Sequence, residues 1–147
     1  MKLVIQRVEK ARVFRESDKK TVGEIGRGLF VLVGFKKGDS EKDVEDLADK
    51  LAKLRVMGDD RQKMNLSVKD VGAEILVVSQ FTLYADTEGG NRPSFIEAED
   101  PLKAKELYEL FIKKLIEKDI KVETGSFGDY MQIEATLDGP VTIIYSD

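Results

Sequence analysis

The sequence predicts a single β-rich α+β domain over residues 1–147, in which mixed and antiparallel sheet accompanies two main helices. Three observations predict this class. A length of 147 residues is typical of one domain. The segments that follow Ser40 and Asp100 carry apolar residues at helical spacing. The rest of the chain contains about seven or eight apolar or alternating segments of strand length, separated by turn residues.

The strands are predicted from these apolar segments, and the turns from the polar residues between them. Alternation along the predicted strand at 74–83 would place Ser79 and Phe81 on one face and Gln80 and Thr82 on the other. Asp138-Gly139 is a common hairpin-turn pair and predicts a turn before a last strand that opens with Pro140. The predicted strands are residues 4–8, 11–14, 21–25, 29–33, 74–83, a short one at Val122, 131–135 and 141–145.

Both helices are predicted from their first residues. Ser40 is a favourable N-cap, and Asp43 can complete a capping box with it. Asp100 is the predicted N-cap of the second helix, and Pro101 takes the first position, where a missing N–H is tolerated. The apolar positions expected to face the core are Val44, Leu47, Ala48, Leu51, Ala52 and Leu54, then Ala104, Leu107, Tyr108, Phe111, Ile112 and Leu115.

The chain contains no histidine and no cysteine, which excludes several classes of chemistry. Without imidazole there is no Ser-His-Asp or Cys-His machinery and no His-ligated zinc. Without thiols there are no disulfides or thiolate metal sites. Hydrolysis by this chain would therefore use carboxylates, lysine, main-chain dipoles or a group of the substrate. The net charge of −4 disfavours a grip on a long stretch of nucleic acid, so such a partner would be held over a small footprint.

The sequence predicts neither a membrane partner nor a bound cofactor. No segment has the apolar length of a signal peptide or of a membrane span, so we expect a cytoplasmic protein. The acidic pairs Asp59-Asp60 and Asp86/Glu88 lack the spacing of a calcium loop. No phosphate-binding glycine fingerprint precedes a helix. We therefore predict no metal site and no cofactor.

Three polar side chains, those of Ser79, Gln80 and Thr82, stand at the end of an otherwise apolar segment. A strand that emerges into solvent and a reactive site both explain this pattern. A Thr82 nucleophile would need Lys63 or a carboxylate as its base, because there is no histidine. The residues alone leave open a Thr82-centred esterase or peptidase, and a non-enzymatic dimeric module that binds RNA 3′ ends or nucleotides.

Several short motifs occur in order along nearly the whole chain. The most specific are Ser79-Gln80-Phe81-Thr82 and Gly139-Pro140-Val141-Thr142, which together form a strong signal, although either alone would be weak. With them, the sequence resembles the D-aminoacyl-tRNA deacylase family. The other matching positions are Gln6-Arg7-Val8, Gly34, Lys63-Met64-Asn65, Gly90-Asn91-Arg92-Pro93-Ser94-Phe95, Thr124-Gly125 and Phe127-Gly128.

The resemblance implies a twofold homodimer that hydrolyses the ester bond of D-aminoacyl-tRNA, and of glycyl-tRNA mischarged on tRNA-Ala, at sites on the subunit interface. It implies a cis bond between Gly139 and Pro140, whose carbonyls enter the partner's pocket and leave no room for an L side chain. The 3′-terminal adenosine of tRNA would lie near Ser79 to Thr82. The residues implied in catalysis are Ser79, Gln80, Phe81 and Thr82. The residues implied in substrate binding and chiral selection are Gly139, Pro140, Arg7, Met131 and Phe127.

The implied mechanism agrees with a chain that lacks histidine. The free ribose hydroxyl beside the ester would position or activate water, while the N–H groups of Phe81 and Thr82 stabilise the oxyanion. Arg7 is expected to fix the Gly-Pro loop by donating hydrogen bonds to carbonyls. The chain departs from the family at Leu137, where asparagine is common, and at Asp129, where alanine is frequent. We expect the first to change how the loop is braced and the second to change the pocket wall.

Overall fold

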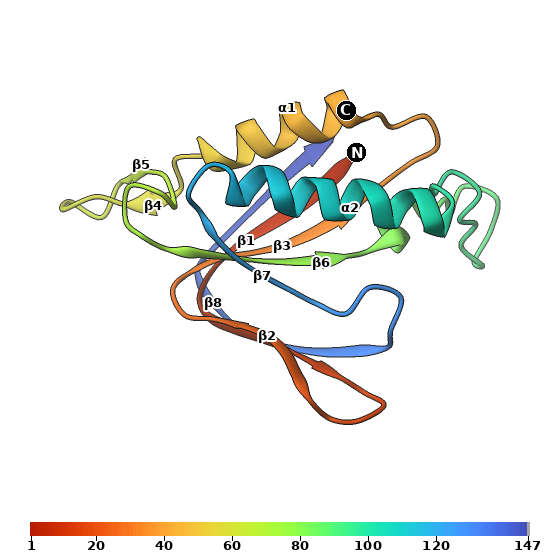
Figure 1. The fold of residues 1–147 in the computed structure, drawn as a ribbon, viewed down its shortest axis with the longest axis horizontal. Helices are drawn as coiled ribbons and strands as arrows, with labels where there is room; N and C mark the ends of the chain where they lie inside the picture. The colour runs from red at the N-terminus through yellow and green to blue at the C-terminus, as the bar shows by residue number, and fades with distance from the viewer. Residues whose placement is uncertain (147) are drawn as a thin grey trace.

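The computed structural model describes residues 1–146 and contains eight strands, two α-helices and a one-turn 3-10 helix (Figure 1). The predicted α+β class with two main helices is confirmed. In chain order the elements are β1 (Lys2–Arg15), β2 (Thr21–Ile25), β3 (Gly28–Gly34), α1 (Glu41–Ala52), β4 (Met57–Gly58), β5 (Met64–Leu66), β6 (Glu74–Ser79), η1 (Phe81–Tyr84), α2 (Pro101–Ile116), β7 (Lys121–Thr124) and β8 (Met131–Ser146).

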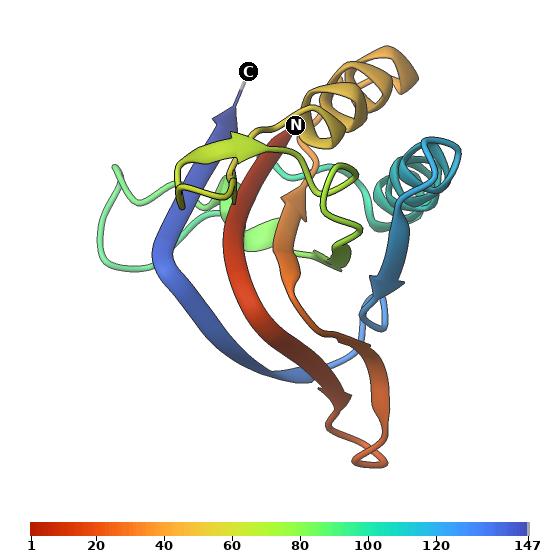
Figure 2. The same ribbon diagram turned by 90° about the vertical axis from the view of Figure 1, so that its left-hand side faces the viewer.

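A six-stranded sheet is organised around β1. Its strand order is β2-β1-β3-β6-β7, and β8 also pairs with β1. The first half of β1 lies between β3 and β8, and the second half lies between β2 and β8. The β3–β6 and β6–β7 pairs are parallel and the pairs made by β1 are antiparallel, so the sheet is mixed, as predicted. Figure 2 shows how strongly β8, β1 and β3 curve.

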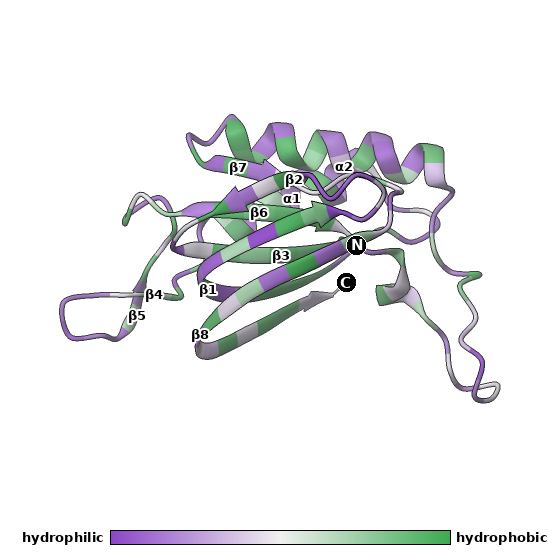
Figure 3. Ribbon diagram, turned by 90° about the horizontal axis from the view of Figure 1, so that it is seen from below, coloured by the Kyte–Doolittle hydropathy of each residue, from purple (hydrophilic) through white to green (hydrophobic). Residues whose placement is uncertain are grey.

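Both helices cover the same face of the curved sheet (Figure 1), and each face of the sheet has its own core. Alternation along β3 sends Leu29, Val31 and Val33 toward the helices and Phe30 toward the opposite face. The same alternation appears as a change of colour along β1 and β8 in Figure 3. The core on the face away from the helices consists of Val8, Ala11, Val13, Ile25, Phe30, Leu76 and Val78.

The predicted helix caps are confirmed. The Asp43 carboxylate accepts from the Ser40 N–H at 2.8 Å, and the Ser40 hydroxyl accepts in return from the Asp43 N–H. Asp100 caps α2, and Pro101 is its first residue. Because α1 ends at Ala52, Leu54 packs against the core from outside the helix. Neither helix among residues 1–146 has the length and apolarity needed to cross a membrane.

β6 is shorter than predicted, which changes the shape of the candidate site. The strand ends at Ser79, and the one-turn helix η1 follows. The prediction that Ser79 and Phe81 share one face of a strand was therefore wrong. The Gln80 N–H still donates to the Val33 carbonyl at 2.8 Å, but β3 ends one residue later and offers no further partner. The chain then turns, and the Leu83 N–H donates to the Gln80 carbonyl.

β8 continues through Asp138-Gly139-Pro140 and does not turn back there. The predicted hairpin turn was therefore wrong, because both halves of β8 pair with the 14-residue strand β1. Between the pairs Val8↔Leu137 and Gln6↔Thr142, β1 has only Arg7, whereas β8 has residues 138–141. This excess of residues on one strand is a large β-bulge, here named the Gly-Pro bulge. Pairing with a long continuous partner strand overrides the local turn preference.

Candidate active site

The Ser79-Gln80-Phe81-Thr82 segment lies where β6 ends and η1 begins. Gln80 Nε2 donates to Thr82 Oγ1 at 2.5 Å. The Phe81 side chain is 57% exposed, and its ring meets the Phe95 ring edge-on at 5.1 Å. The first hydrogen bond of η1 comes from the Leu83 N–H, so the N–H groups of Phe81 and Thr82 have no partner inside η1. The segment thus presents main-chain donors, polar side chains and an aromatic ring together.

Phe127 and Met131 approach the same end of β6. The Gly125 N–H donates to the Val77 carbonyl at 3.1 Å. A Cβ at Gly125 would lie 2.9 Å from Met131 Sδ and 3.3 Å from Val78 Cγ2, which shows how closely Met131 packs there. Phe127 follows Gly125 by two positions. The structure therefore brings two residues predicted for substrate binding next to the strand end that carries the predicted catalytic segment.

Tyr108 on α2 connects Phe127 and β6 to the helical layer. Its side chain is buried, its hydroxyl donates to the Val77 carbonyl at 2.8 Å, and its ring lies 5.6 Å from the Phe127 ring. Burial raises the pKa of the Tyr108 hydroxyl above its ordinary value, so the group stays a neutral donor at physiological pH. Helical spacing predicts Tyr108 as a core residue, but no sequence signal indicates its contact with Phe127 and β6.

Replacing Tyr108 with phenylalanine should lower the free energy of unfolding by about 1 kcal/mol, because a buried hydrogen bond to the Val77 carbonyl is lost while the ring packing remains. Urea denaturation measures this difference. Tyr130→Phe is the matched control, since that side chain is 79% exposed and its replacement should be neutral. Equal unfolding midpoints for the two variants would show that the Tyr108 hydroxyl does not stabilise the folded state.

Gly139 and Pro140 form the centre of the Gly-Pro bulge and are joined by a cis peptide bond, as the resemblance implies. Gly139 has a φ of +119°, a conformation that L side chains rarely adopt. A side chain would also be crowded, because a Cβ would lie 2.9 Å from Val141 Cγ2 and 3.1 Å from Arg7 Nη2, and these side chains would have to move. Both the backbone conformation and the contacts therefore favour glycine at this position.

Arg7 lies on β1 directly opposite the bulge and holds it. Its Nε donates to the Asp138 main-chain oxygen at 3.3 Å and forms a 3.0 Å ion pair with the Asp138 carboxylate. Its Nη1 donates to the Val56 carbonyl at 2.8 Å. With a side chain only 15% exposed, Arg7 ties the bulge to the segment that leads into β4. The predicted contact between Arg7 and a carbonyl of this loop is present, and its importance for activity stays a prediction.

The Gly-Pro bulge and the predicted catalytic segment of one chain lie in different parts of the sheet. The bulge is opposite Arg7, which pairs with Leu29, and Leu29 in turn pairs with Ile75 on β6. Ser79 lies four positions further along β6, or about 13 Å along a strand. Three inter-strand steps of about 5 Å each separate β8 from β6. The fold of one chain therefore does not bring the two halves of the predicted site together.

The two departures from the family lie near the two ends of the first half of β8. Leu137 is 45% exposed and pairs with Val8, so its side chain offers the bulge no polar brace. The Asp138–Arg7 ion pair lies beside it on the bulge itself. The Asp129 carboxylate accepts from the Ser126 hydroxyl and lies 3.9 Å from Arg15 Nη1. Asp129 thus fastens the loop before β8 to the end of β1.

The acidic pairs singled out in the sequence close turns. Asp59 Oδ1 accepts from the N–H groups of Arg61 and Lys63, each at 2.9 Å, in the turn between β4 and β5. Asp86 Oδ1 accepts from the Glu88 N–H, also at 2.9 Å. Figure 1 shows the β4–β5 hairpin at the opposite end of the sheet from the C-terminal end of β6. Lys63, in the turn of this hairpin, is therefore remote from the predicted catalytic segment of its own chain.

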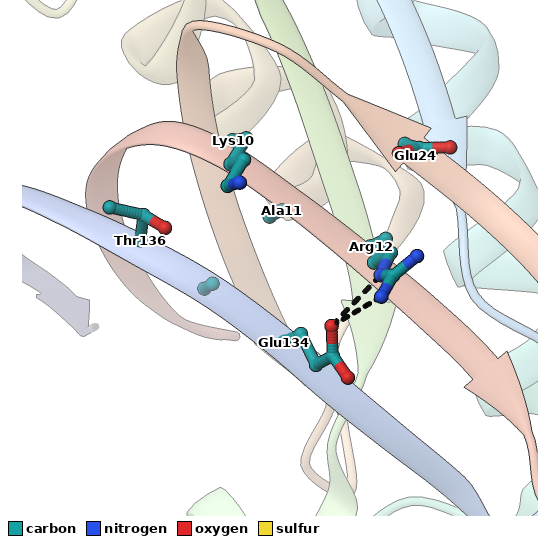
Figure 4. Close-up of a pocket in the computed structure, with 7 residues that line it drawn as sticks. Lys10, Ala11, Arg12, Glu24, Glu134 and Thr136 are labelled. Carbon is teal, nitrogen blue, oxygen red and sulfur yellow. Dashed lines mark hydrogen bonds and ion pairs between the residues drawn. The ribbon is translucent and has the colours of Figure 1, made fainter.

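Two surface hollows contain none of the predicted site residues. One is a groove of about 260 Å³ across β2, β1 and β8, in which Arg12 and Glu134 form a 2.8 Å ion pair (Figure 4). The other, of about 500 Å³, lies between the start of α1 and α2. The groove is lined by Lys10, Ala11, Arg12, Glu24, Glu134, Ala135 and Thr136. These two hollows are thus separate from the predicted site.

Similarity to known proteins extends over nearly the whole chain. The family model described as D-Tyr-tRNA(Tyr) deacylase matches residues 4–146. The D-aminoacyl-tRNA deacylase of Thermotoga petrophila is 56% identical over 144 residues, which cover 98% of this chain and 95% of that protein. The protein of the same name from Aquifex aeolicus is 54% identical, with 98% and 96% covered.

Two solved structures share the fold. The c-Myc DNA unwinding element binding protein superposes with a TM-score of 0.92 at 38% identity, covering 100% of this chain and 99% of that one. A probable eukaryotic D-amino acid tRNA deacylase superposes with a TM-score of 0.84, covering 98% and 97% of the two chains. Its identity of 15% bears on the fold alone. Both structures agree with the α+β architecture.

Proposed function

The chain belongs to the D-Tyr-tRNA(Tyr) deacylase family, and from this premise we propose how its site is assembled, how it selects its substrate and what performs the chemistry. The protein is a D-aminoacyl-tRNA deacylase, a hydrolase that splits the ester between a D-amino acid and tRNA. The site residues, the subunit arrangement and the catalytic route described below are the proposal.

One observation carries the proposed assembly: the rigid Gly-Pro bulge lies away from the catalytic segment of its own chain. Among the described strands β8 pairs only with β1, so its outer edge leaves main-chain N–H and C=O groups available for pairing. Ile133, Leu137 and Ile144 are 38%, 45% and 62% exposed along this strand. We propose that two copies of the chain associate along the exposed side of β8 as a twofold homodimer. The Gly-Pro bulge of each subunit then enters the active site of the other subunit.

In this arrangement, the main chain of the Gly-Pro bulge acts as a wedge that distinguishes D- from L-aminoacyl groups. The carbonyls of Gly139 and Pro140 would face the α-carbon of the aminoacyl group and occupy the space that an L side chain needs. Arg7 limits movement of this wedge, because it binds Asp138 of the bulge from the neighbouring strand β1. Rejection by a fixed clash discriminates more strongly than differences in attraction. Glycine has no side chain to reject, so glycyl-tRNA is also a substrate in this scheme.

The chemistry uses the substrate and main-chain donors. The ribose hydroxyl next to the ester positions or activates the attacking water. The N–H groups of Phe81 and Thr82, at the free end of η1, stabilise the oxyanion that develops on the ester carbonyl. Only the 3′-terminal adenosine end of the tRNA enters the site, which agrees with the net charge of −4. A tRNA substrate is consistent with the cytoplasmic location that we propose.

Replacing Thr82 with alanine should leave kcat/KM for D-Tyr-tRNA within about fivefold of wild type, because the N–H of residue 82 is retained. The hydrogen bond of the Thr82 hydroxyl comes from the Gln80 amide, which is not a base. Deacylation of labelled D-Tyr-tRNA measures the effect. Near-total loss of activity in the variant, with an acyl-enzyme trapped in the wild type, would establish a Thr82 nucleophile.

The test of the proposed function is deacylation of D-Tyr-tRNA, L-Tyr-tRNA and Gly-tRNA-Ala under one set of conditions, with sedimentation velocity to report the number of subunits. We expect fast release of D-tyrosine and glycine, retention of L-tyrosine, and a dimer. A substrate whose terminal adenosine lacks the 2′-hydroxyl should react at least about 100-fold more slowly. Tight RNA binding without turnover would favour the binding module, and cleavage of simple esters would favour a general esterase.

A further inference from the structure

Lys2, at the start of β1, reaches the far end of η1. Its Nζ donates to the Leu83 carbonyl at 3.0 Å and lies 4.9 Å from the centre of the Tyr84 ring. Lys2, Leu83 and Tyr84 are all partly buried. One ammonium group therefore satisfies a carbonyl in the last turn of η1 and also makes a cation–π contact with the last residue of that helix.

The beginning of η1 is fixed by β3. The Gln80 N–H donates to the Val33 carbonyl at 2.8 Å. A Cβ at Gly34 would lie 2.9 Å from the Gln80 carbonyl oxygen and 3.1 Å from Leu83 Cβ, so η1 packs directly on the glycine backbone. Phe81 and Thr82 lie between this contact and the Lys2 contact. Each end of η1 thus has its own anchor on the sheet.

η1 is short and exposed, so anchors at its two ends limit its movement. It has one turn, none of its residues is buried, and Gln80 provides no side-chain cap. A single 3-10 turn with few apolar contacts is marginal and tends to fray. Where such a turn must hold two N–H groups on a developing charge, a small displacement reduces transition-state stabilisation.

We propose that Lys2 is a positioning residue of the deacylase. By binding Leu83 and Tyr84, it holds η1 so that the N–H groups of Phe81 and Thr82 stay aimed at the ester carbonyl. This inference rests on the proposed function of that segment. Lys2 does not touch the reacting atoms in this scheme, so its loss affects turnover more than substrate binding.

The test compares Lys2→Met with Lys2→Arg and with Lys10→Met, a control on the same strand whose side chain is exposed. Lys2→Met should lower kcat for D-Tyr-tRNA about tenfold and leave KM within about twofold. Lys2→Arg, which keeps a cation and a donor, should recover most of the rate, and Lys10→Met should match wild type. Tyr84→Leu should give a smaller loss of the same kind.

A second measurement separates this inference from the proposed function. Amide hydrogen exchange of Leu83 and Ala85, whose N–H groups donate to the Gln80 and Thr82 carbonyls, should accelerate in Lys2→Met and not in Lys10→Met, as followed by NMR and whether or not the wild type deacylates D-Tyr-tRNA. Unchanged exchange, or a Lys2→Met enzyme with wild-type kcat, overturns the positioning role. A wild type with no deacylase activity overturns the proposed function, while the exchange result still decides how η1 is held.

Discussion

Replacing Gly139 with alanine should lower the rate of D-Tyr-tRNA deacylation at least about 100-fold, the order expected when a positioning group is displaced by about 1 Å. The added methyl group would lie 3.1 Å from Arg7 Nη2 and 2.9 Å from Val141 Cγ2, at a φ of +119°. The bulge must therefore shift, and the wedge shifts with it. Residual activity should also discriminate less between D-Tyr-tRNA and L-Tyr-tRNA.

Gly26→Ala is the matched control, because a Cβ at Gly26 would meet no atom within 4 Å. Both variants are compared by deacylation assays and by thermal unfolding. Gly26→Ala should keep full activity. A folded, dimeric Gly139→Ala enzyme with wild-type rates on both substrates would remove the Gly-Pro bulge from the mechanism.

Replacing Arg7 with methionine should lower kcat/KM for D-Tyr-tRNA about 30-fold, because the bulge loses the group that holds it. The variant leaves the Val56 carbonyl and the Asp138 carboxylate without their arginine partner, so the free energy of unfolding should also fall by about 1–3 kcal/mol. Arg7→Lys should recover only part of the activity. A lysine ammonium does not reproduce the guanidinium, which donates to the main-chain carbonyls of both Val56 and Asp138.

The control for Arg7 is Arg12→Met. Both arginines lie on β1, and each is paired with an acidic residue of β8, Asp138 or Glu134. Arg12, however, is 46% exposed in the groove of Figure 4, where an ion pair contributes little to stability. Arg12→Met should unfold within about 0.5 kcal/mol of wild type and keep its activity. Equal losses in the two variants would mean that Arg7 acts only through the general stability of the sheet.

The elements that sequence analysis predicted well are those that local chemistry determines. Ser40 and Asp100 cap the two helices, and the apolar run at 29–33 forms a central strand, because the signal lies in adjacent residues. The errors in strand boundaries have the opposite origin. The strands predicted at 4–8 and 11–14 are one continuous strand, β1, which pairs along its length with β8. β6 ends at Ser79 because β3 ends at Gly34, and β8 passes through Asp138-Gly139 because β1 is long enough to pair with both halves. Each boundary depends on a strand distant in sequence.

The same distinction applies to the site. The motifs indicated Arg7, the Ser79-Gln80-Phe81-Thr82 segment and the Gly-Pro pair, because a family resemblance records residue identities. The partners that fix them were not predictable. The Val56 carbonyl that receives the Arg7 guanidinium is a main-chain group with no sequence signal, and Lys2 reaches Leu83 across 81 positions. Such contacts exist only after the strands have been placed side by side.

The position of the bulge on the outermost strand has a consequence for how the enzyme responds to dilution. Under the proposed arrangement, an isolated subunit carries a complete set of residues but no complete site, so association and catalytic competence are one equilibrium governed by mass action. Specific activity should therefore fall as the protein concentration drops below the dissociation constant of the pair. Mixing a Gly139→Ala subunit with a subunit defective only at its own η1 would rebuild one working site in each mixed pair.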